Sequence, residues 1–439
     1  MEPGIRFPRY DVYKDSGAGW LGKIPCDWSI KSIRAVTQLK SEKNQPDLQV
    51  LSVYREHGVI IKDSRDDNHN ATSLDTSGYK VVDKGDLVVN KMKAWQGSMG
   101  VSDHYGLVSP AYITCRVDTE RVYPKFLHYL LRSKPYIGIY NALSYGVRVG
   151  QWDMHYEDFK HIPIPIPEKK TQDRIADFLD QKTAEIDKAV AKKQRLIELL
   201  KEQKAILINQ AVTRGMNPDA PMRDSGVEWI GEIPAHWEVK KLKYFSEVQS
   251  GITLGKLYSE NTLISVPYLR VANVQDGYFK LDDVAELQLP RRIITQYLVR
   301  VGDILVTEGG DIDKLGRGNV WTGEIENCIH QNHIFAIRVK QNIASEYFIS
   351  LATGVDYGRR YFTHTANKTT NLASTNRTKL GNFPIALPPI NEQLSIVEYA
   401  NGINSKYDLL IKIVQKEMSH LNEFKQTIIS NAVTGKIKI

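Results

Sequence analysis

The chain has 439 residues, of which 25% are charged and 42% hydrophobic, and it carries a formal net charge of +7. This composition is typical of a soluble globular protein with two to three domains. No apolar run approaches the roughly 18 residues of a membrane span, and the first residues lack the apolar core of a signal peptide. The three widely separated cysteines fit a reducing cytoplasm, with neither a disulfide framework nor a C-x-x-C zinc site. The net charge permits a polyanionic partner without requiring one.

The first part of the chain reads as a β-rich globule. It opens with a Trp-x-Gly-x-Ile-Pro-x-x-Trp-like segment over 15–28, and short β-branched runs follow at 81–82, 86–90 and 111–117. A short helix is expected over 125–132. The alternating prolines at 163–167 cannot be helical and form a stiff exit from the globule.

The range 171–212 contains neither Pro nor Gly and predicts one long helix. Its apolar positions recur about every 3.5 residues, which is the period of a coiled-coil seam. At about 1.5 Å per residue the helix would be about 63 Å long, too long to pack inside an ordinary domain. The expected seam consists of Ile175, Leu179, Lys182, Ile186, Ala189, Lys193, Leu196, Leu200, Gln203 and Leu207.

The same features then return in the same order, which identifies an internal repeat. The opening segment returns at 224–237, the Gly-Asp-hydrophobic strand at 302–306, a helix at 346–353 and the proline-rich exit at 384–389. Strands are expected at 303–307 and 334–339. A second long helix follows without a gap, with Gln172 matching Gln393. Its expected seam consists of Ile396, Ala400, Ile403, Tyr407, Leu410, Val414, Glu417, Leu421, Phe424 and Ile428.

The repeat predicts an α+β chain ordered as globule, helix, globule, helix. We expect the first domain over 1–168, the first helix over 169–215, the second domain over 216–390 and the second helix over 391–439. Each helix has an apolar stripe that needs a cover, and the other helix is the simplest cover. Antiparallel packing of the two helices would produce a pseudo-twofold arrangement, with the chain ends near the junction of the first globule and the first helix.

The two copies share the recurring motifs described above but differ in the segments between those motifs. The segment 91–97 follows one strand, and the unrelated segment 308–318 follows its counterpart. This pattern is typical of two binding surfaces of one kind with different specificity. Ordinary drift of surface loops after a duplication explains it equally well.

The order of these motifs and their duplication resemble the specificity (S) subunits of Type I restriction–modification enzymes. The proline-rich exits into Pro-x-x-x-x-Gln at 167–172 and 388–393 and the final Ala-Val-Thr-Gly at 432–435 also resemble this family. The first copy departs slightly, with Lys170-Thr171-Gln172 where the second has the more typical Asn391-Glu392-Gln393.

The resemblance implies two target recognition domains that each read half of a split double-stranded DNA site, separated by an antiparallel coiled coil that sets their spacing. It also implies a subunit without chemistry of its own and without a directly bound cofactor. Two methyltransferase (M) subunits would bind S-adenosylmethionine, and restriction (R) subunits, held through them, would use ATP and Mg²⁺.

Candidate catalytic motifs are absent or weak. The chain has no Gly-x-x-x-x-Gly-Lys-Ser/Thr loop for ATP and no Asn-Pro-Pro-aromatic motif of amino-methyltransferases. Glu238 and Lys240 have the spacing of a metal-dependent nuclease, but the matching first-copy residue is Ser29. Cys328, His330 and His333 could outline a metal site, although the first copy has no such ligands and a structural role is favoured.

Polar and basic residues in the divergent loops are the candidates for DNA contact, since Arg pairs with guanine and Asn or Gln with adenine. They are Lys91, Lys93, Gln96, Arg148 and Gln151 in the first copy, and Lys314, Arg317, Asn319, Asn367, Lys368 and Arg377 in the second. For any single one, a solvated surface charge is the competing interpretation. A scaffold or adaptor without a DNA role is the competing function, and salt-dependent binding to duplex DNA separates the two.

Overall fold

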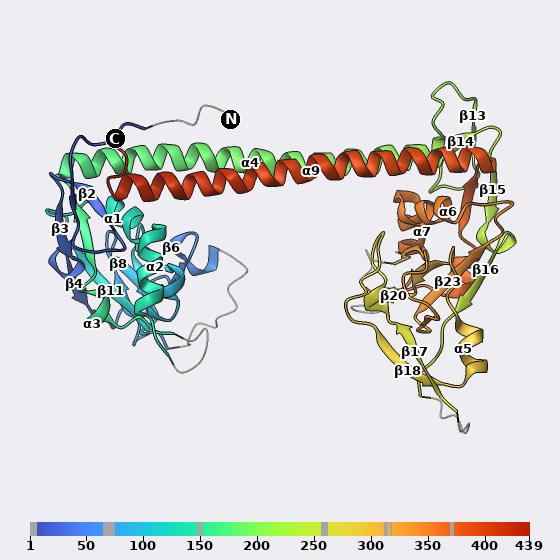
Figure 1. The fold of residues 1–439 in the computed structure, drawn as a ribbon, viewed down its shortest axis with the longest axis horizontal. Coiled ribbons are helices and arrows are strands. Elements are labelled where there is room, and N and C mark those ends of the chain that lie inside the picture. The colour runs from blue at the N-terminus through green and yellow to red at the C-terminus, as the bar shows by residue number, and fades with distance from the viewer. Residues whose placement is uncertain are drawn as a thin grey trace. The chain divides into compact units, whose positions relative to one another are not determined.

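The computed structural model describes residues 7–64, 75–146, 152–255, 262–310, 315–316, 318–368 and 373–439. The chain divides into two compact units, one formed by Met1–Gln194 with Gln415–Ile439 and the other by Arg195–Val414. We call them unit 1 and unit 2. Each contains a β-rich domain and part of two long helices, α4 (Lys169–Arg214) and α9 (Ile390–Val433) (Figure 1). None of the helices in these described ranges is long and apolar enough to cross a membrane.

A four-stranded antiparallel sheet forms the centre of each β-rich domain, and the two sheets have the same strand order. This confirms the expected β-rich repeat. In unit 1 the order is β4 (Thr37–Lys40), β11 (Tyr112–Val117), β8 (Leu87–Asn90) and β9 (Met99–Val101). In unit 2 it is β16 (Ser246–Ser250), β23 (Ile334–Val339), β19 (Ile304–Thr307) and β21 (Gly318–Val320).

Shorter elements surround the unit 1 sheet. The strands are β1 (Tyr13–Asp15), β2 (Lys23–Pro25), β3 (Ser29–Ser32), β5 (Leu51–Tyr54), β6 (Gly58–Ile61), β7 (Lys80–Val82), β10 (Gly106–Val108) and β12 (Pro163–Ile166). The helices are α1 (Pro124–Leu131), α2 (Lys134–Leu143) and α3 (Tyr156–Phe159). Helix α1 confirms the helix expected from the sequence.

Unit 2 repeats this plan and enlarges it. Its other strands are β13 (Met222–Asp224), β14 (Glu232–Pro234), β15 (Glu238–Lys241), β17 (Ile264–Leu269), β18 (Ala285–Leu289), β20 (Gly309–Gly310), β22 (Ile329–His330), β24 (Asn367–Lys368), β25 (Ala373–Ser374) and β26 (Pro384–Leu387). Its helices are α5 (Arg291–Tyr297), α6 (Glu346–Gly354), α7 (Asp356–Thr365) and α8 (Arg377–Gly381). The sheet β18-β17-β22 and α5 surround a separate small apolar cluster.

The proline-rich exits form the last strand of each domain before its long helix. β12 pairs with β3, and β26 pairs with β15, both antiparallel. A buried glutamine in the first turn of each helix then binds the domain. Gln172 Oε1 accepts a hydrogen bond from the Tyr123 N–H at 2.7 Å, and its amide nitrogen donates to the Pro167 carbonyl at 2.9 Å.

Gln393 makes the same contacts in unit 2. Its Oε1 accepts from the Ser345 N–H at 2.9 Å, and its amide nitrogen donates to the carbonyls of Pro388 at 2.8 Å and Ile343 at 3.0 Å. Tyr123 and Ser345 are the N-cap residues of α1 and α6. One amide therefore joins the start of a long helix to a short helix of the domain, which explains the spacing of the Pro-x-x-x-x-Gln motif.

The far end of each long helix packs on a buried tryptophan of the opening motif. Gly215, after α4, and Gly435, after α9, both have a positive φ of about 70°. A Cβ on Gly215 would lie 3.2 Å from the Trp237 ring, and one on Gly435 would lie 2.3 Å from Pro25 and 3.3 Å from the Trp28 ring. A side chain at either position would disturb this close packing.

The second helix is shorter than the expected range of 391–439. It ends at Val433, and the remaining residues form a tail that packs against the N-terminal segment of unit 1. The Lys438 N–H donates to the Pro8 carbonyl at 2.8 Å, and the Lys436 ammonium donates to the Leu21 carbonyl at 3.3 Å. The C-terminus therefore lies in unit 1, as expected.

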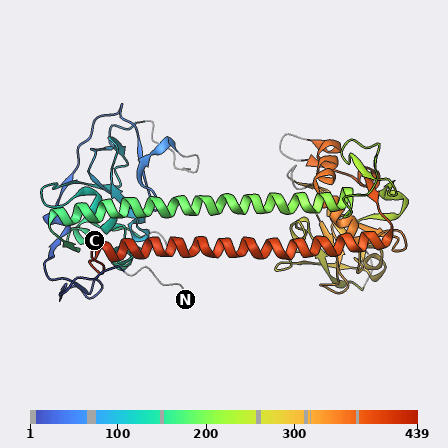
Figure 2. The ribbon, with the colours of Figure 1, turned by 90° about the horizontal axis from the view of Figure 1, so that it is seen from above.

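Within each unit α4 and α9 lie side by side and antiparallel (Figure 2), which confirms the predicted packing. Ion pairs join them at 2.6 Å between Asp187 and Lys425 and at 2.5 Å between Lys193 and Glu417 in unit 1. In unit 2, Lys204 and Asp408 form an ion pair at 2.8 Å that corresponds in the repeat to the Asp187–Lys425 pair. These pairs are partly exposed, so each contributes about 1 kcal/mol or less and the apolar seam carries the association.

The predicted seam is wrong in its details, because several of its residues do not lie on the face where α4 and α9 contact each other. Ile197 is 3% exposed while the predicted Leu196 is 42% exposed, and Ile411 is 9% exposed while the predicted Leu410 is 37% exposed. A straight helix has about 3.6 residues per turn, so a strict seven-residue repeat rotates away from the contact line by about 20° per heptad. The predicted seam positions that are exposed are Leu196, Gln203, Leu410, Glu417 and Phe424.

Replacing Gln393 with Glu should lower the stability of the full chain by at least about 2 kcal/mol. The carboxylate cannot donate to the two carbonyls that the amide now satisfies, and each buried unsatisfied group costs about 1–3 kcal/mol. Thermal unfolding measures this loss. Glu398→Gln, an exposed change on the same helix, is the matched control and should stay within about 0.5 kcal/mol. Equal melting temperatures for both variants would contradict the role of this amide.

Candidate nucleic-acid interface

In unit 1 the predicted residues Lys91, Lys93 and Gln96 lie on one short 3₁₀ helix, η3 (Lys91–Gln96), directly after β8. The helix ends at Gly97, whose φ is 87°, and a Cβ there would lie 2.9 Å from Ile137 of α2. Glycine thus permits both the turn and the close approach of α2. Lys93 is exposed and Gln96 is half-buried.

A second segment of unit 1 reaches the same place. Tyr145 and Asp153 form an antiparallel β-bridge, so the chain leaves α2 and returns beside η3. There the Met154 N–H donates to the Lys91 carbonyl at 2.9 Å. The Lys91 ammonium lies 3.3 Å from the Asp153 carboxylate. Predicted residues Arg148 and Gln151 fall between these anchors but outside the described residues.

In unit 2 the predicted residues gather on a small three-stranded sheet, in the order β20-β25-β24. Asn367 and Lys368 form β24 and are exposed, and Arg377 is exposed at the start of α8. The side chain of Asn376 caps α8 by accepting a hydrogen bond from the Lys379 N–H at 2.9 Å. The predicted residues Lys314 and Arg317 lie outside the described residues.

The two units join these segments in the same way. In unit 2 the Thr375 N–H donates to the Glu308 carbonyl at 2.7 Å, as Met154 does to Lys91 in unit 1. Glu308 follows β19 directly, as Lys91 follows β8. Each unit therefore presents a composite surface made of the segment after its third sheet strand and a hairpin that follows its second short helix.

The side chains on these two surfaces differ in charge and kind. Where unit 1 has the Lys91–Asp153 pair, unit 2 has Glu308 with His333, whose Nδ1 lies 2.5 Å from the carboxylate. Under the unit 1 surface, Asn90 donates to the Tyr112 hydroxyl at 3.3 Å, and burial raises the pKa of Tyr112. A common backbone arrangement thus carries two chemically different surfaces.

Several residues of these surfaces were missed by the sequence analysis. Lys379 donates to the Asn367 side-chain oxygen at 2.6 Å. In unit 1 the rings of Trp95 and Trp152 lie 5.2 Å apart, and Tyr145 stacks on His155 at 4.8 Å. Half-exposed aromatic rings can stack on nucleic-acid bases. Their shared position beside the divergent loops is a usable signal, whereas the predicted DNA-contact residues are all basic or amide side chains.

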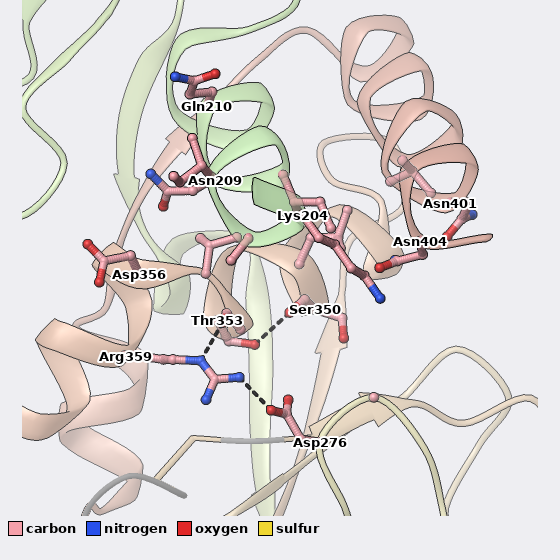
Figure 3. Close-up of a pocket in the computed structure, with 18 of the residues that line it drawn as sticks. Lys204, Asn209, Gln210, Asp276, Ser350, Thr353, Asp356, Arg359, Asn401 and Asn404 are labelled. Atoms are coloured by element: carbon pink, nitrogen blue, oxygen red, sulfur yellow. Dashed lines mark hydrogen bonds and ion pairs between the residues drawn. The ribbon is translucent and has the colours of Figure 1, made fainter. Parts of the chain in front are cut away.

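Asn319 borders a separate hollow of unit 2. It lies on β21 and lines a cavity of about 1140 Å³ bounded by α4, α9, α6 and α7 (Figure 3). Across the cavity Arg359 donates to Asp276 and, at 2.7 Å, to the Gly354 carbonyl. At the equivalent place in unit 1, the Tyr129 hydroxyl donates to Asp180 of α4 at 2.7 Å. Ser350 occupies the tyrosine position of the repeat in unit 2 and is too short to span the gap.

Cys328, His330 and His333 do not form a metal site among the described residues. His330 is buried, with Nδ1 2.9 Å from the Ile334 carbonyl. Burial raises the pKa of the Cys328 thiol to about 12. Among the residues with described positions, no group of three metal-binding side chains is found. Glu238 pairs with Lys240 on β15, which lowers the pKa of this exposed carboxyl.

Comparisons with known proteins agree with one another. Residues 25–199 match the family model described as the Type I restriction modification DNA specificity domain. The EcoKI Type I specificity subunit of Escherichia coli is 21% identical over 95% of this chain and 90% of its own length. The MjaX specificity subunit of Methanocaldococcus jannaschii is 27% identical over 47% of each chain.

A solved structure has a similar fold. A chain from work on complex assembly and conformational transition of the Type I R-M system covers 93% of this chain, with a TM-score of 0.67 and 17% identity. The chain spans 98% of that structure. This likeness concerns the fold, including the two packed long helices.

Replacing Lys93 or Lys368 with Ala should weaken binding of duplex DNA by the full chain. A lost phosphate contact lowers the salt slope of binding by about one, whereas a lost base contact costs about 1–3 kcal/mol and relaxes specificity. Mobility shifts at several salt concentrations separate these outcomes. The controls Lys84→Ala and Lys340→Ala remove exposed charges at the opposite end of each sheet. If Lys93→Ala and Lys368→Ala behave like these controls, both residues are only solvated surface charges.

Proposed function

We propose that each unit reads one half of a bipartite DNA site, because this chain belongs to the family of Type I restriction–modification specificity subunits. As a DNA specificity subunit it is non-catalytic, and the methylation and restriction activities lie in M and R subunits. The proposal concerns how recognition is divided within the chain and which residues perform it.

The observation that carries the proposal is the equivalent hydrogen bond from Met154 to Lys91 and from Thr375 to Glu308. In both units this hydrogen bond holds a hairpin beside the segment that follows the third strand of the sheet. The exposed side chains on the hairpin and on that segment differ between the units. Uniform drift would alter anchors and loops alike. Retained anchors with altered exposed groups are what two recognition surfaces of different specificity require, since backbone frames position and side chains specify.

The side chains on these surfaces suit both the neutralisation of DNA phosphates and the recognition of bases. Exposed Lys93, Lys368 and Arg377 can neutralise phosphates, and this term is independent of sequence. Asn367 and Gln96 carry amides that can pair with adenine in the major groove. The flanking aromatic rings add apolar contact. We infer that the segments 91–97 and 145–154 form one recognition surface, and that 308–310 and 367–377 form the other.

The long helices provide the second part of the proposed function, which is to hold the partner subunits. In this arrangement two M subunits, each with its own S-adenosylmethionine, dock on α4 and α9, and R subunits with ATP and Mg²⁺ join through them. The specificity subunit itself takes no cofactor. These assignments follow from the family, as does the cytoplasmic location.

Exchanging the loops of one unit should change one half of the recognised sequence and leave the other intact. The exchange replaces 91–97 and 145–154 with the matching segments of a relative of different specificity. Methylated-site sequencing of the chimera shows which bases changed. A chimera whose two half-sites both change would show that the units do not read independently.

Removing four residues from each long helix should shorten the spacer between the half-sites. Deleting 194–197 together with 415–418 removes roughly one turn, or about 6 Å of rise, which corresponds to one or two base pairs at about 3.4 Å each. Methylated-site sequencing should return the same half-sites at a shorter separation. Deleting 194–197 alone misaligns the seam and is the control for general damage. An unchanged spacer with full activity would mean that the helices hold partners without acting as a ruler.

A further inference from the structure

The pair formed by Glu308 and His333 distinguishes the recognition surface of unit 2 from that of unit 1. Strand pairing places Ala111, directly before β11, at the position that His333 holds directly before β23. In unit 1 the residue after the third sheet strand, Lys91, pairs with Asp153 of the hairpin instead. The shared backbone frame therefore does not require a polar side chain at the position of His333.

The backbone of Glu308 is held on two sides. Its N–H donates to the His333 carbonyl at 2.8 Å, and its own carbonyl accepts from the Thr375 N–H at 2.7 Å. Gly309 and Gly310 follow and pair with β25, so the next two residues add no side chains to this part of the surface. The Glu308 carboxylate thus extends from a fixed point between the sheet and the hairpin.

This carboxylate orients the His333 ring. A carboxylate can only accept a hydrogen bond, so the ring nitrogen Nδ1, 2.5 Å from it, carries the hydrogen. The bond fixes the tautomer and leaves Nε2 as the second polar atom of the ring. The side chain of His333 is 55% exposed and that of Glu308 is 27% exposed. Among the residues that the structure describes, the ring has no hydrogen-bond partner other than Glu308.

The charge of the pair indicates which hydrogen bond Nε2 makes on DNA. With a neutral ring the pair keeps the negative charge of Glu308, which the DNA phosphates repel. With a charged ring the pair is neutral, so binding to DNA favours the charged ring. Both nitrogens of a charged imidazole are donors. In the major groove guanine presents two acceptors, O6 and N7, whereas adenine presents a donor where guanine has O6.

We propose that His333 is a specificity-determining residue of unit 2, whose Nε2 donates to a guanine in the half-site that this unit reads. Glu308 is a positioning residue, because it acts only through the ring. The inference rests on the proposed function and extends it to one side chain and one base. Ala111 offers unit 1 no such contact, so the dependence on His333 is confined to one half-site.

The variant His333→Ala in the full complex tests the inference, and the frame should tolerate it because unit 1 has alanine at the matching position. Methylated-site sequencing should return the wild-type site with one guanine relaxed. That guanine should lie in the half-site that the exchange of 91–97 and 145–154 leaves unchanged. Replacing its G·C pair with A·T should weaken wild-type binding about five- to tenfold, while His333→Ala should bind both duplexes within about twofold of each other.

Two further variants examine the role of the carboxylate. Glu308→Ala should relax the same guanine, because nothing then holds the ring. Glu308→Gln keeps an oxygen that can accept from Nδ1 and should discriminate better than Glu308→Ala. The matched control is His236→Ala. The His236 ring lies 2.8 Å from the Glu392 carboxylate, and the two side chains are 51% and 27% exposed. This pair joins the domain to α9 and lies outside the recognition segments, so its loss should leave every base of the site unchanged.

An unchanged site for His333→Ala would overturn the inference, as would relaxation of an adenine or a cytosine instead of a guanine. A Glu308→Gln variant no better than Glu308→Ala would overturn the positioning role. Intact reading of the other half-site by the same molecules shows that the variant is folded. If His333→Ala relaxes nothing while the loop exchange still changes one half-site, only this inference fails. If the loop exchange changes both half-sites or neither, the proposed function fails.

Discussion

The buried amides of Gln172 and Gln393 are the contacts on which the geometry of each unit depends. Each amide satisfies an N-cap N–H and two carbonyls at the point where strand, short helix and long helix meet. Both side chains are almost fully buried, so a lost bond cannot be replaced by solvent. The proline-rich strands before them admit few conformations, and together these constraints fix how a long helix leaves its domain.

A rigid frame of this kind lets exposed side chains change without changing the fold. The Gly-Asp motif inside each sheet likewise keeps its backbone contact while its side-chain partner changes. Asp86 and Asp303 each accept a hydrogen bond from the N–H three residues earlier, yet Asp86 pairs with Lys40 and Asp303 with Arg338. Burial alone would lower the pKa of Lys40, but its hydrogen bonds to Asp83 and Asp86 raise it. The side chains on the surfaces beside these strands differ far more between the two units.

Much of this architecture could be predicted from the sequence, because the Trp, Pro, Gly and Gln residues that recur in both copies occupy positions where packing, backbone conformation or hydrogen bonding requires them. The seam was predicted only approximately, since apolar Leu196 and Leu410 satisfy a seven-residue repeat while facing away from the partner helix. Of the candidate site residues, the structure brings together Lys91, Lys93 and Gln96, and separately Asn367, Lys368 and Arg377, but places Asn319 at a cavity. The hairpin contact at Met154 could not be predicted, because a backbone hydrogen bond leaves no side-chain signature.

The central claim is that each unit carries its own recognition surface on a shared backbone frame. Photo-crosslinking tests this claim most directly. The full complex is bound to DNA that carries a photoreactive base in one half-site at a time, and the crosslinked peptides are then mapped. The account predicts crosslinks to 91–97 and 145–154 from one half-site, and to 308–310 and 367–377 from the other. Crosslinks from both half-sites to the same unit, or to the long helices alone, would contradict it.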